Sequence, residues 1–208
     1  MNCISIRIHN IVIIAVLLVA AACSSSPHLP PLSTGATILA FGDSLTAGTG
    51  AAEGESYPAN LARMTGRKVI NAGIPGEVSS EGLLRLPEFM EREKPALLIL
   101  CHGGNDLLRH LDQKLLTDNL RAMLKLAQEK GVPVLLVAVP SPDLFLKPPA
   151  LYAELAKEFN IPLENKTLPH ILGKSALKSD HFHPNAAGYR AVAEDLLKLL
   201  KKSGALSS

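Results

Sequence analysis

Short apolar segments alternate with amphipathic segments along most of the chain, which is the pattern of strands that alternate with helices. Unbroken apolar runs of about four to eight residues are typical of strands buried on both faces of a sheet. We expect five strands, and the last is expected at an edge because it contains a proline. The five segments are 37–41, 68–72, 96–101, 132–139 and 161–163.

Two stretches have apolar residues at helical spacing. The first covers 116–127 and ends before Gly131, and the second covers 189–200 near the end of the chain. Strands that alternate with helices imply a parallel sheet covered on both faces, which is a three-layer α/β/α fold with a central sheet of about five strands. No repeat or second domain is evident. In such a sheet, functional residues lie in loops past the carboxyl ends of the strands.

The beginning of the chain has the features of a targeting segment. Residues 11–22 are apolar throughout, and this run is too short to span a bilayer comfortably but suits the central region of a signal peptide. Small residues stand directly before Cys23 and resemble the cleavage site of bacterial lipoproteins, in which the cysteine becomes lipidated. Ser24 to Thr34 is rich in serine and proline, and we expect it to be a tether.

These features divide the chain into a signal peptide (1–22), a lipidated Cys23 with its tether (23–35) and one folded domain (36–203). Several acyl chains on Cys23 would anchor the protein stably to a membrane. The residue after the cysteine is not an aspartate, which favours the outer membrane of a bacterial envelope. The alternatives are a secretory signal cut near Ala22, which would release a periplasmic or secreted protein, and an uncleaved anchor.

Composition and charge exclude several classes of partner. Of 208 residues, 47% are hydrophobic, and 21 basic against 19 acidic side chains leave a net charge of +2. A chain so close to neutrality gives no reason to expect nucleic acid. Aromatic residues make up only 4%, with no tryptophan, which argues against an aromatic sugar cleft, and three cysteines cannot form a disulfide framework.

Four loops, three at expected strand ends and one near the carboxyl terminus, carry groups suited to nucleophilic catalysis. A serine needs a base, and an aspartate three residues before a histidine can orient the imidazole for that role. Each loop alone is more typical of an ordinary polar turn. The loops are Gly42-Asp43-Ser44-Leu45, Asn71 to Glu77, Gly103-Gly104-Asn105-Asp106 and Asp180 to His183.

Together and in this order, the four loops resemble the sequence blocks of the GDSL or SGNH hydrolase family, over about 38–200. Segment 71–86 and the final His-Pro-Asn are most similar to a bacterial subgroup of multifunctional thioesterases, lysophospholipases and arylesterases. The resemblance implies a flavodoxin-like fold. It also implies that Ser44 is the nucleophile, Asp180 the orienting acid and His183 the base. The oxyanion donors that it implies are Ser44, Gly76 and Asn105.

The chain departs from the family pattern directly after the glycine of the second block. The family usually has an aspartate and a threonine there, whereas this chain has Glu77 and Val78. The change removes a hydroxyl group from the loop and leaves its shape in question, but it removes no catalytic atom.

The resemblance implies a serine hydrolase of carboxylic esters or thioesters that works through an acyl-serine and needs no metal or cofactor. Its substrate would be a small-molecule acyl ester, and the enzyme is expected to be a monomer. A carbohydrate O-deacetylase of the cell envelope is one alternative. A catalytically inactive lipoprotein that binds a partner is another, although the complete set of site residues argues against it.

Apolar residues in two loops on the expected site side are candidates for an acyl pocket. Leu107 and Leu108 follow the third block, and Leu144, Phe145 and Leu146 follow the fourth strand. The alternative for the second group is that these side chains cap the core.

Four other residues near the expected site are assigned supporting roles. We expect Asp43 to bond to nearby backbone and His102 to be a hydrogen-bonded histidine at a strand end rather than a second base. Cys101 is expected to be an inert buried thiol, and His181 a loop residue beside the site.

Overall fold

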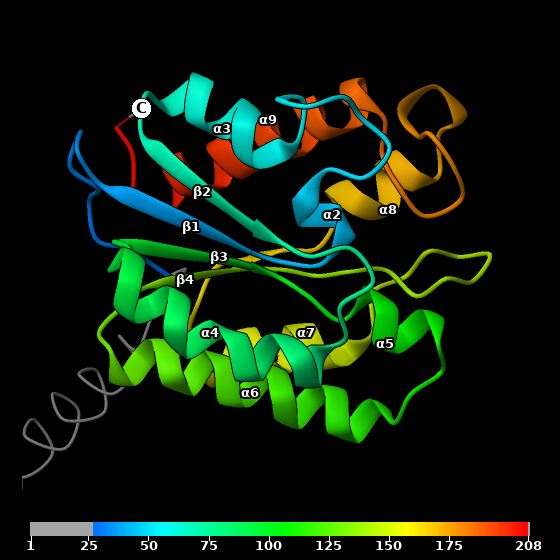
Figure 1. The fold of residues 1–208 in the computed structure, drawn as a ribbon, viewed down its shortest axis with the longest axis horizontal. Helices are drawn as coiled ribbons and strands as arrows, with labels where there is room; N and C mark the ends of the chain where they lie inside the picture. The colour runs from blue at the N-terminus through cyan, green and yellow to red at the C-terminus, as the bar shows by residue number, and fades with distance from the viewer. Residues whose placement is uncertain (1–26, 208) are drawn as a thin grey trace, which may run out of the picture.

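A five-stranded parallel sheet forms the middle layer of the computed structural model, which describes residues 27–207 (Figure 1). The strand order is β2-β1-β3-β4-β5, and each neighbouring pair is parallel. All five strands lie at or next to the predicted segments, and the three-layer α/β/α fold is confirmed. The strands are β1 (Thr37–Gly42), β2 (Lys68–Gly73), β3 (Leu97–Cys101), β4 (Val134–Val137) and β5 (Leu163–Glu164).

The central strands explain the unbroken apolar runs in the sequence. The residues from Ile38 to Phe41 in β1 and from Leu97 to Leu100 in β3 are completely inaccessible to solvent. Because helices cover both faces of these strands, side chains that point to either face must be apolar. β4 is shorter than the predicted segment 132–139, and Pro133 and Pro140 stand on either side of the strand.

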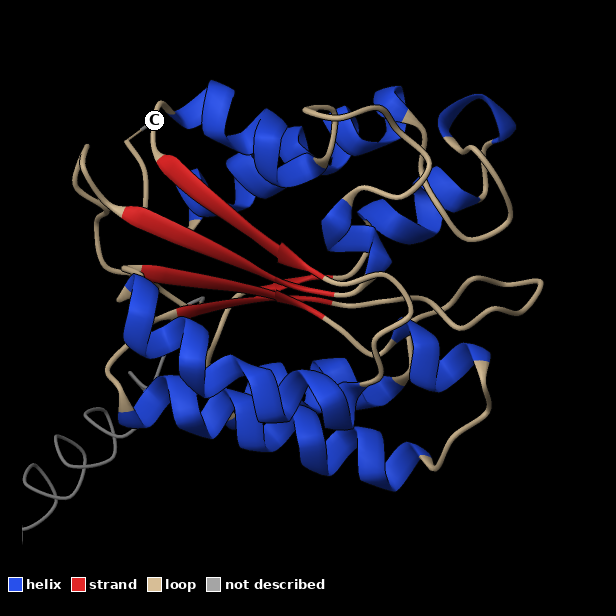
Figure 2. Ribbon diagram, viewed as in Figure 1, coloured by secondary structure: helices blue, strands red, loops and turns tan. Residues whose placement is uncertain are grey.

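Helices cover both faces of the sheet (Figure 2). One face carries α2 (Ser44–Ala47), α3 (Tyr57–Thr65), α8 (Thr167–Leu172) and α9 (Ala186–Lys202). The opposite face carries α4 (Ser79–Glu93), α5 (Gly104–Leu108), α6 (Gln113–Glu129) and α7 (Ala150–Glu158). α3 packs against α9, and α4 packs against α6. The predicted helices at 116–127 and 189–200 are confirmed as parts of α6 and α9.

Helix α4 was not expected, because Gly82 and Pro87 interrupt its sequence and both disfavour a helix interior. It forms because its buried face packs on α6 and β1. Gly82, Leu86 and Met90 lie on that face, with Leu86 completely buried. Tertiary packing therefore outweighs weak local propensity in this helix.

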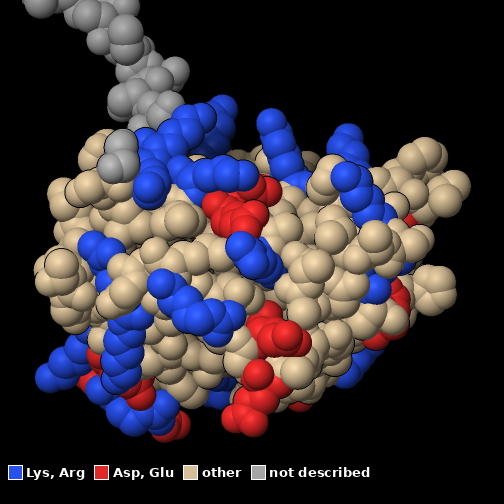
Figure 3. Space-filling view, turned by 90° about the horizontal axis from the view of Figure 1, so that it is seen from above, with Lys and Arg blue, Asp and Glu red and all other residues tan. Residues whose placement is uncertain are grey.

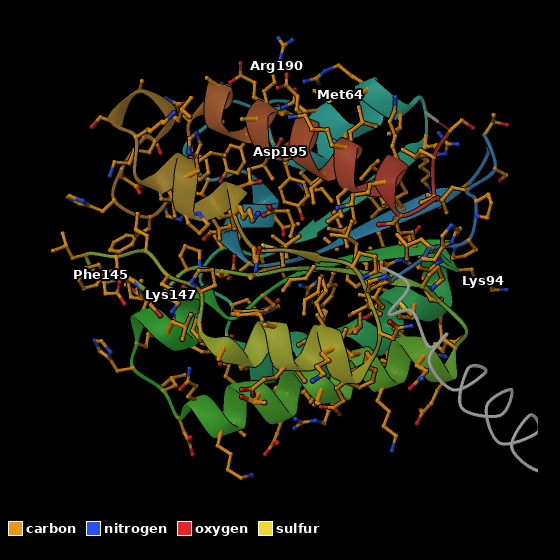
Figure 4. The ribbon with its side chains drawn as sticks, turned by 180° about the vertical axis from the view of Figure 1, so that it is seen from behind. Met64, Lys94, Phe145, Lys147, Arg190 and Asp195 are labelled. Carbon is orange, nitrogen blue, oxygen red and sulfur yellow. The ribbon has the colours of Figure 1, made fainter. Side chains whose placement is uncertain are left out.

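The outer surface of α3 and α9 carries both signs of charge. Figure 3 shows Lys and Arg interspersed with Asp and Glu on this side of the molecule. Along α9, Arg190 pairs with Glu194 at 3.1 Å and Lys198 pairs with Asp195 at 2.6 Å. Arg190 points away from the sheet in Figure 4. This surface is a solvated helix face.

The first described residues pack against the end of α9. The backbone N–H of Leu29 donates to the carbonyl of Ser203, and that of Leu32 donates to the carbonyl of Ala205, each at 2.8 Å. Both leucine side chains are buried, as is Ala205. The packed body therefore includes chain on both sides of the segment 36–203 that was expected to form the domain.

The expected tether, residues 23–35, is only partly described. From Leu29 onward it belongs to the packed body rather than to a free linker. The expected signal peptide and Cys23 lie outside the described residues. Within residues 27–207, no helix has the length and apolar character needed to cross a membrane.

Candidate active site

The four loops singled out in the sequence meet at the edge of the sheet where the parallel strands end (Figure 1). β1 leads into Ser44, β2 leads into the turn that contains Gly76, and β3 leads into Asn105. The fourth loop precedes α9 and brings His183 to the same edge. These four residues, which are far apart in the sequence, border a single cavity.

Ser44, His183 and Asp180 form a continuous chain of hydrogen bonds. His183 Nε2 lies 2.9 Å from Ser44 Oγ, and His183 Nδ1 lies 2.8 Å from Asp180 Oδ2. An ionised carboxylate only accepts hydrogen bonds, so Nδ1 carries the ring proton. Nε2 of the neutral ring is then the acceptor for the serine hydroxyl. The structure therefore brings together the serine, histidine and aspartate to which the family resemblance assigns a shared role.

The Asp180 carboxylate is held in its charged form by its neighbours. Its Oδ1 accepts the backbone N–H groups of Phe182 at 2.7 Å and His183 at 2.8 Å. Partial burial alone would raise the pKa of Asp180, but the hydrogen bonds from the His183 ring and from these two N–H groups lower it. Asp180 is consequently ionised at neutral pH and can stabilise a positive charge on the imidazole.

Ser44 is the first residue of α2, and Asp43 caps that helix. The buried Asp43 carboxylate accepts the N–H of Leu45 at 3.0 Å and the N–H of Gly104 at 3.2 Å. Burial raises the pKa of Asp43, although its hydrogen bonds and the nearby histidines partly oppose the rise. As expected, Asp43 supports the backbone around the serine, and it also ties this loop to the loop after β3.

Gly76 occupies a tight turn that the sequence encodes directly. The N–H of Glu77 donates to the carbonyl of Ile74 at 3.2 Å, and Gly76 has a φ of +82°. A proline followed by a glycine with positive φ is the residue pair that a type II turn requires, and Pro75 precedes Gly76 here. The Gly76 carbonyl accepts a hydrogen bond from Arg109 Nη2 at 2.8 Å. The loop therefore has a defined shape despite its departure from the family pattern at Glu77.

Asn105 is the second residue of the short helix α5. Its side-chain Nδ2 donates to the carbonyl of Glu77 at 2.9 Å. This bond joins the loop after β3 to the turn that contains Gly76. An amide nitrogen carries two hydrogens, so the second N–H of Asn105 can donate to another acceptor.

A cavity of about 750 Å³ opens beside Ser44. Besides the site residues, its walls are mainly apolar, and a drug-sized ligand or an acyl chain fits within this volume. Lys178 and His181 add polar groups on the side of the loop before α9. The apolar walls include Leu45, Leu108, Val139, Leu144, Leu146 and Leu172.

Of the five leucine and phenylalanine residues expected to line the pocket, three do so and two do not. Leu108, Leu144 and Leu146 border the cavity. Leu107 instead packs against the hydrophobic core, because it lies on the inner side of α5. Phe145 is 84% exposed and points into solvent at the end of its loop (Figure 4).

Sequence reasoning missed several apolar wall residues. Leu45 belongs to the serine motif, and its position next to Ser44 already indicates a place beside the site. Val139 is the second residue after β4, so it lies at the strand end where such sites form. Leu172 and Phe182 enter the wall from α8 and from the loop before α9, and no local pattern in the sequence distinguishes them.

The supporting residues lie where the sequence analysis expected them. His102 is completely buried and hydrogen-bonded at the end of β3. Cys101 is buried as well, and burial raises the pKa of its thiol well above the usual value, so the thiol stays protonated and inert. His181 lies in the exposed loop beside the cavity.

Residues 40–191 match the GDSL-like Lipase/Acylhydrolase family. The thioesterase 1/protease 1/lysophospholipase L1 of Escherichia coli K12 is 32% identical over 177 residues, covering 79% of this chain and 83% of that protein. The arylesterase of Vibrio mimicus is 30% identical over 179 residues, covering 79% of this chain and 88% of that protein. Among solved structures, the psychrotrophic esterase EstA from Pseudoalteromonas sp., inhibited by monoethylphosphonate, is similar with a TM-score of 0.71 at 28% identity, covering 80% of this chain and 97% of EstA.

These likenesses span the described domain and agree with the geometry of the site. The relatives are named as thioesterase, lysophospholipase, arylesterase and esterase, so the alternative of an inactive binding protein is not supported. The chain belongs to the GDSL-like lipase/acylhydrolase family and is an ester-hydrolysing enzyme.

Proposed function

We propose that Ser44 is the nucleophile, His183 the general base and Asp180 the group that orients the base. The observation that carries this proposal is the unbroken hydrogen-bond chain from Asp180 through His183 to Ser44 Oγ, with distances of 2.8 and 2.9 Å. A serine hydroxyl is a weak nucleophile at neutral pH and needs a base in contact with it. Asp180 keeps the proton on Nδ1 and stabilises the imidazolium that forms.

The oxyanion is assigned to three donors. They are the backbone N–H groups of Ser44 and Gly76 and the side-chain amide of Asn105. One Asn105 hydrogen is engaged by the Glu77 carbonyl at 2.9 Å, which orients the amide and leaves its second hydrogen for the substrate. A donor of this kind typically contributes about 3 kcal/mol of transition-state stabilisation.

The reaction proceeds in two steps. Ser44 Oγ bonds to the carbonyl carbon while its proton passes to His183 Nε2. The tetrahedral intermediate then collapses: the bond to the alcohol or thiol breaks, the leaving group takes the proton from His183, and an acyl-serine remains. Water attacks the acyl carbon, gives a proton to His183 and releases the acid as Ser44 regains its proton.

We place the acyl group in the apolar cavity beside Ser44. A volume of about 750 Å³ with walls that include Leu45, Val139 and Leu146 supports substrates with a medium or long acyl chain. An acetyl group on a carbohydrate would leave most of this apolar space unfilled. The relatives' names include both thioesterase and arylesterase, so esters and thioesters both fall within the proposal.

The first test is a series of p-nitrophenyl esters from acetyl to palmitoyl, measured with the wild-type domain and with Ser44→Ala. Turnover should peak at a medium or long chain and fall on the order of 10⁴-fold or more in the variant. A phosphonate inhibitor that leaves a monoethylphosphonate group should modify Ser44, since EstA is inhibited by this group. Mass spectrometry detects the added group on the serine. Retained turnover in folded Ser44→Ala would remove the nucleophile assignment, and activity on acetyl alone would indicate a deacetylase.

We further propose that the enzyme works in the bacterial cell envelope, as a lipoprotein anchored through Cys23. The apolar run before the cysteine supports this placement. The packed body begins only six positions after Cys23, at Leu29, so an anchored domain would stay close to its membrane. Replacing Cys23 by alanine should move the enzyme from the membrane fraction to the soluble fraction. If the distribution does not change, the anchor assignment is wrong.

A further inference from the structure

A buried carboxylate lies directly after the oxyanion turn, at the position where this chain departs from the family pattern. Glu77 is 5% exposed. Arg85 binds it with two nitrogens, Nε to Oε1 at 2.8 Å and Nη2 to Oε2 at 2.6 Å. His102 Nε2 lies 3.1 Å from Oε2. None of the catalytic steps proposed above uses this buried cluster.

The His102 ring is held in one orientation and one tautomer. The N–H of Gly103 donates to His102 Nδ1 at 2.9 Å, so Nδ1 is unprotonated and Nε2 carries the hydrogen that points at Glu77. The ring is completely buried. A Cβ at Gly82 would lie 2.4 Å from Nε2, so only a glycine at this position of α4 leaves room for the imidazole.

The bond between Glu77 and His102 connects two of the loops that carry the oxyanion donors. Glu77 directly follows Gly76, and His102 lies three positions before Asn105. The same two loops are joined a second time, because Asn105 Nδ2 donates to the Glu77 carbonyl at 2.9 Å. The backbone carbonyl of Glu77 thus binds the Asn105 amide, and its side chain binds His102 at the end of β3. Asn105 follows in the loop after that strand.

Arg85 extends this connection to the remaining strand ends. Its Nη2 donates to the carbonyl of Ala72 in β2 at 3.0 Å and contacts the carbonyl of Gly42, the last residue of β1, at 3.5 Å. The guanidinium also stacks on Phe41, with Cζ 4.1 Å from the ring centre. The Glu77 carboxylate is therefore linked to the ends of β1, β2 and β3, which lead to the three proposed oxyanion donors.

We propose that Glu77 and His102 are positioning residues that fix the relative placement of the three oxyanion donors. This inference rests on the proposed roles of Ser44, Gly76 and Asn105. Donors stabilise an oxyanion only if they are already in place when the charge develops, and a misplacement of about 1 Å can cost roughly a hundredfold in rate. Glu77 takes the place of the usual aspartate, and its longer side chain reaches the histidine that this chain carries at the end of β3.

The test compares Glu77→Gln, His102→Leu and His102→Gln in the complete enzyme. The number of active sites is counted by phosphonate labelling of Ser44, so that kcat refers to folded enzyme only. We expect Glu77→Gln and His102→Leu to lower kcat roughly tenfold to a hundredfold with KM changed less than about twofold. His102→Gln keeps an N–H donor for Glu77 and should restore most of the loss.

Two inhibitors distinguish positioning from general loosening of the site. An alkyl boronic acid forms a tetrahedral adduct with Ser44 and places an oxygen among the oxyanion donors, whereas an uncharged alkyl alcohol of the same length has no oxyanion and binds through its apolar chain. In His102→Leu, affinity for the boronic acid should fall by about the same factor as kcat, and affinity for the alcohol should not change. A parallel loss of both affinities would contradict the proposal.

Glu164→Gln is the matched control. Glu164 is also a buried carboxylate at a strand end, but it lies in β5 and caps the N–H of Thr167 at 3.1 Å, away from the oxyanion loops. This variant should lose stability and keep its kcat. Unchanged kcat in folded Glu77→Gln and His102→Leu would overturn the proposal, as would an equal kcat loss in Glu164→Gln. Retained activity in Ser44→Ala would instead overturn the proposed function on which it rests.

Discussion

At the scale of single residues, hydrogen bonds decide which nitrogen of each histidine carries the proton. In His183, Nδ1 donates to Asp180, which leaves Nε2 to accept from Ser44. In His102, Nδ1 accepts from Gly103, which leaves the proton on Nε2. The two rings lie in the same region of the protein but have opposite tautomers, because their nearest backbone and carboxylate partners differ. One ring faces the nucleophile, and the other is sealed in the interior.

Asn105 should contribute to the transition state more than to substrate binding. Asn105→Ala removes the amide that is proposed to donate to the oxyanion, and this group acts only as negative charge develops. We expect kcat to fall by roughly 10²- to 10³-fold with little change in KM. Steady-state kinetics on a p-nitrophenyl ester measures both quantities. If kcat does not change in the folded variant, Asn105 serves only to connect the loops.

The ionisation of Glu77 should make the stability of the enzyme sensitive to acid. Burial alone would raise the pKa of Glu77, but hydrogen bonds from Arg85 and His102 outweigh burial and lower it from its ordinary value of 4.5. The unfolded chain then binds the proton more readily than the folded chain. The carboxylate therefore stabilises the fold above pH 4.5, and this contribution is lost as the pH falls through the lowered folded-state pKa.

Urea denaturation of the wild type and Glu77→Gln, from neutral pH down to about pH 3, measures this contribution. The difference in the free energy of unfolding should be constant at neutral pH and shrink below pH 4.5. Other acids, including Asp43 with its raised pKa, are present in both proteins. Their contributions to the free energy of unfolding therefore cancel in the difference between the two proteins. A difference that stays constant at all pH values would show that Glu77 does not ionise in this way.

At the scale of elements, the loop after β4 shows how a turn assigns neighbouring side chains to different surroundings. The Asp143 carboxylate accepts the backbone N–H groups of Phe145 at 2.9 Å and Leu146 at 3.0 Å. Leu146 takes a φ of +49°, which turns the chain sharply at this point. As a result, Leu146 borders the cavity while Phe145 stands 84% exposed at the loop end.

Replacing these two neighbours should have different effects on acyl-chain preference. Leu146→Ala removes a wall of the cavity, so we expect kcat/KM for a medium-chain ester to fall about tenfold relative to the acetyl ester. Phe145→Ala should leave that ratio unchanged, because its ring does not line the cavity. The ratio is measured with a series of p-nitrophenyl esters. A change of ratio in Phe145→Ala would mean that the loop folds over the substrate.

At the scale of the whole molecule, the site lies at the opposite edge of the sheet from the first and last described residues. The segment after α9 is at the left of Figure 1, whereas the loops that carry the site are at the right. Leu29 and Leu32 pair with the chain around Ser203 and Ala205, so the first described residues lie at the terminal edge as well. Changes to this segment should therefore affect stability and leave the chemistry intact.

Two truncations test this separation. Removing residues 1–26 should leave both the free energy of unfolding and kcat unchanged. Removing residues 1–33 deletes the buried side chains of Leu29 and Leu32, and each buried leucine contributes roughly 1.5–3 kcal/mol. The longer truncation should therefore lose several kcal/mol of stability while its kcat per labelled active site is preserved. Equal stability of the two truncated proteins would show that the segment adds little.

Much of the architecture followed from local patterns. The buried strands β1 and β3 are continuous apolar runs, and α6 and α9 have regular helical spacing, so their types could be predicted without tertiary information. Helix α4 could not be predicted, because Gly82 and Pro87 weaken its local signal and only packing on α6 explains it. The inner position of Leu107 and the outer position of Phe145 likewise depend on contacts beyond their own segments.

The sequence by itself determined the five strands and the helices α6 and α9, because apolar periodicity is a local property. Through the resemblance of its four loops to a known family, it also indicated five site residues: Ser44, Gly76, Asn105, Asp180 and His183. The tertiary structure alone decided that these residues meet in space and which side chains face the cavity. It also decided that Glu77 is bound by His102, which is 25 positions away in the chain. Such a contact depends on how parallel strands bring their ends together, and no local pattern records it.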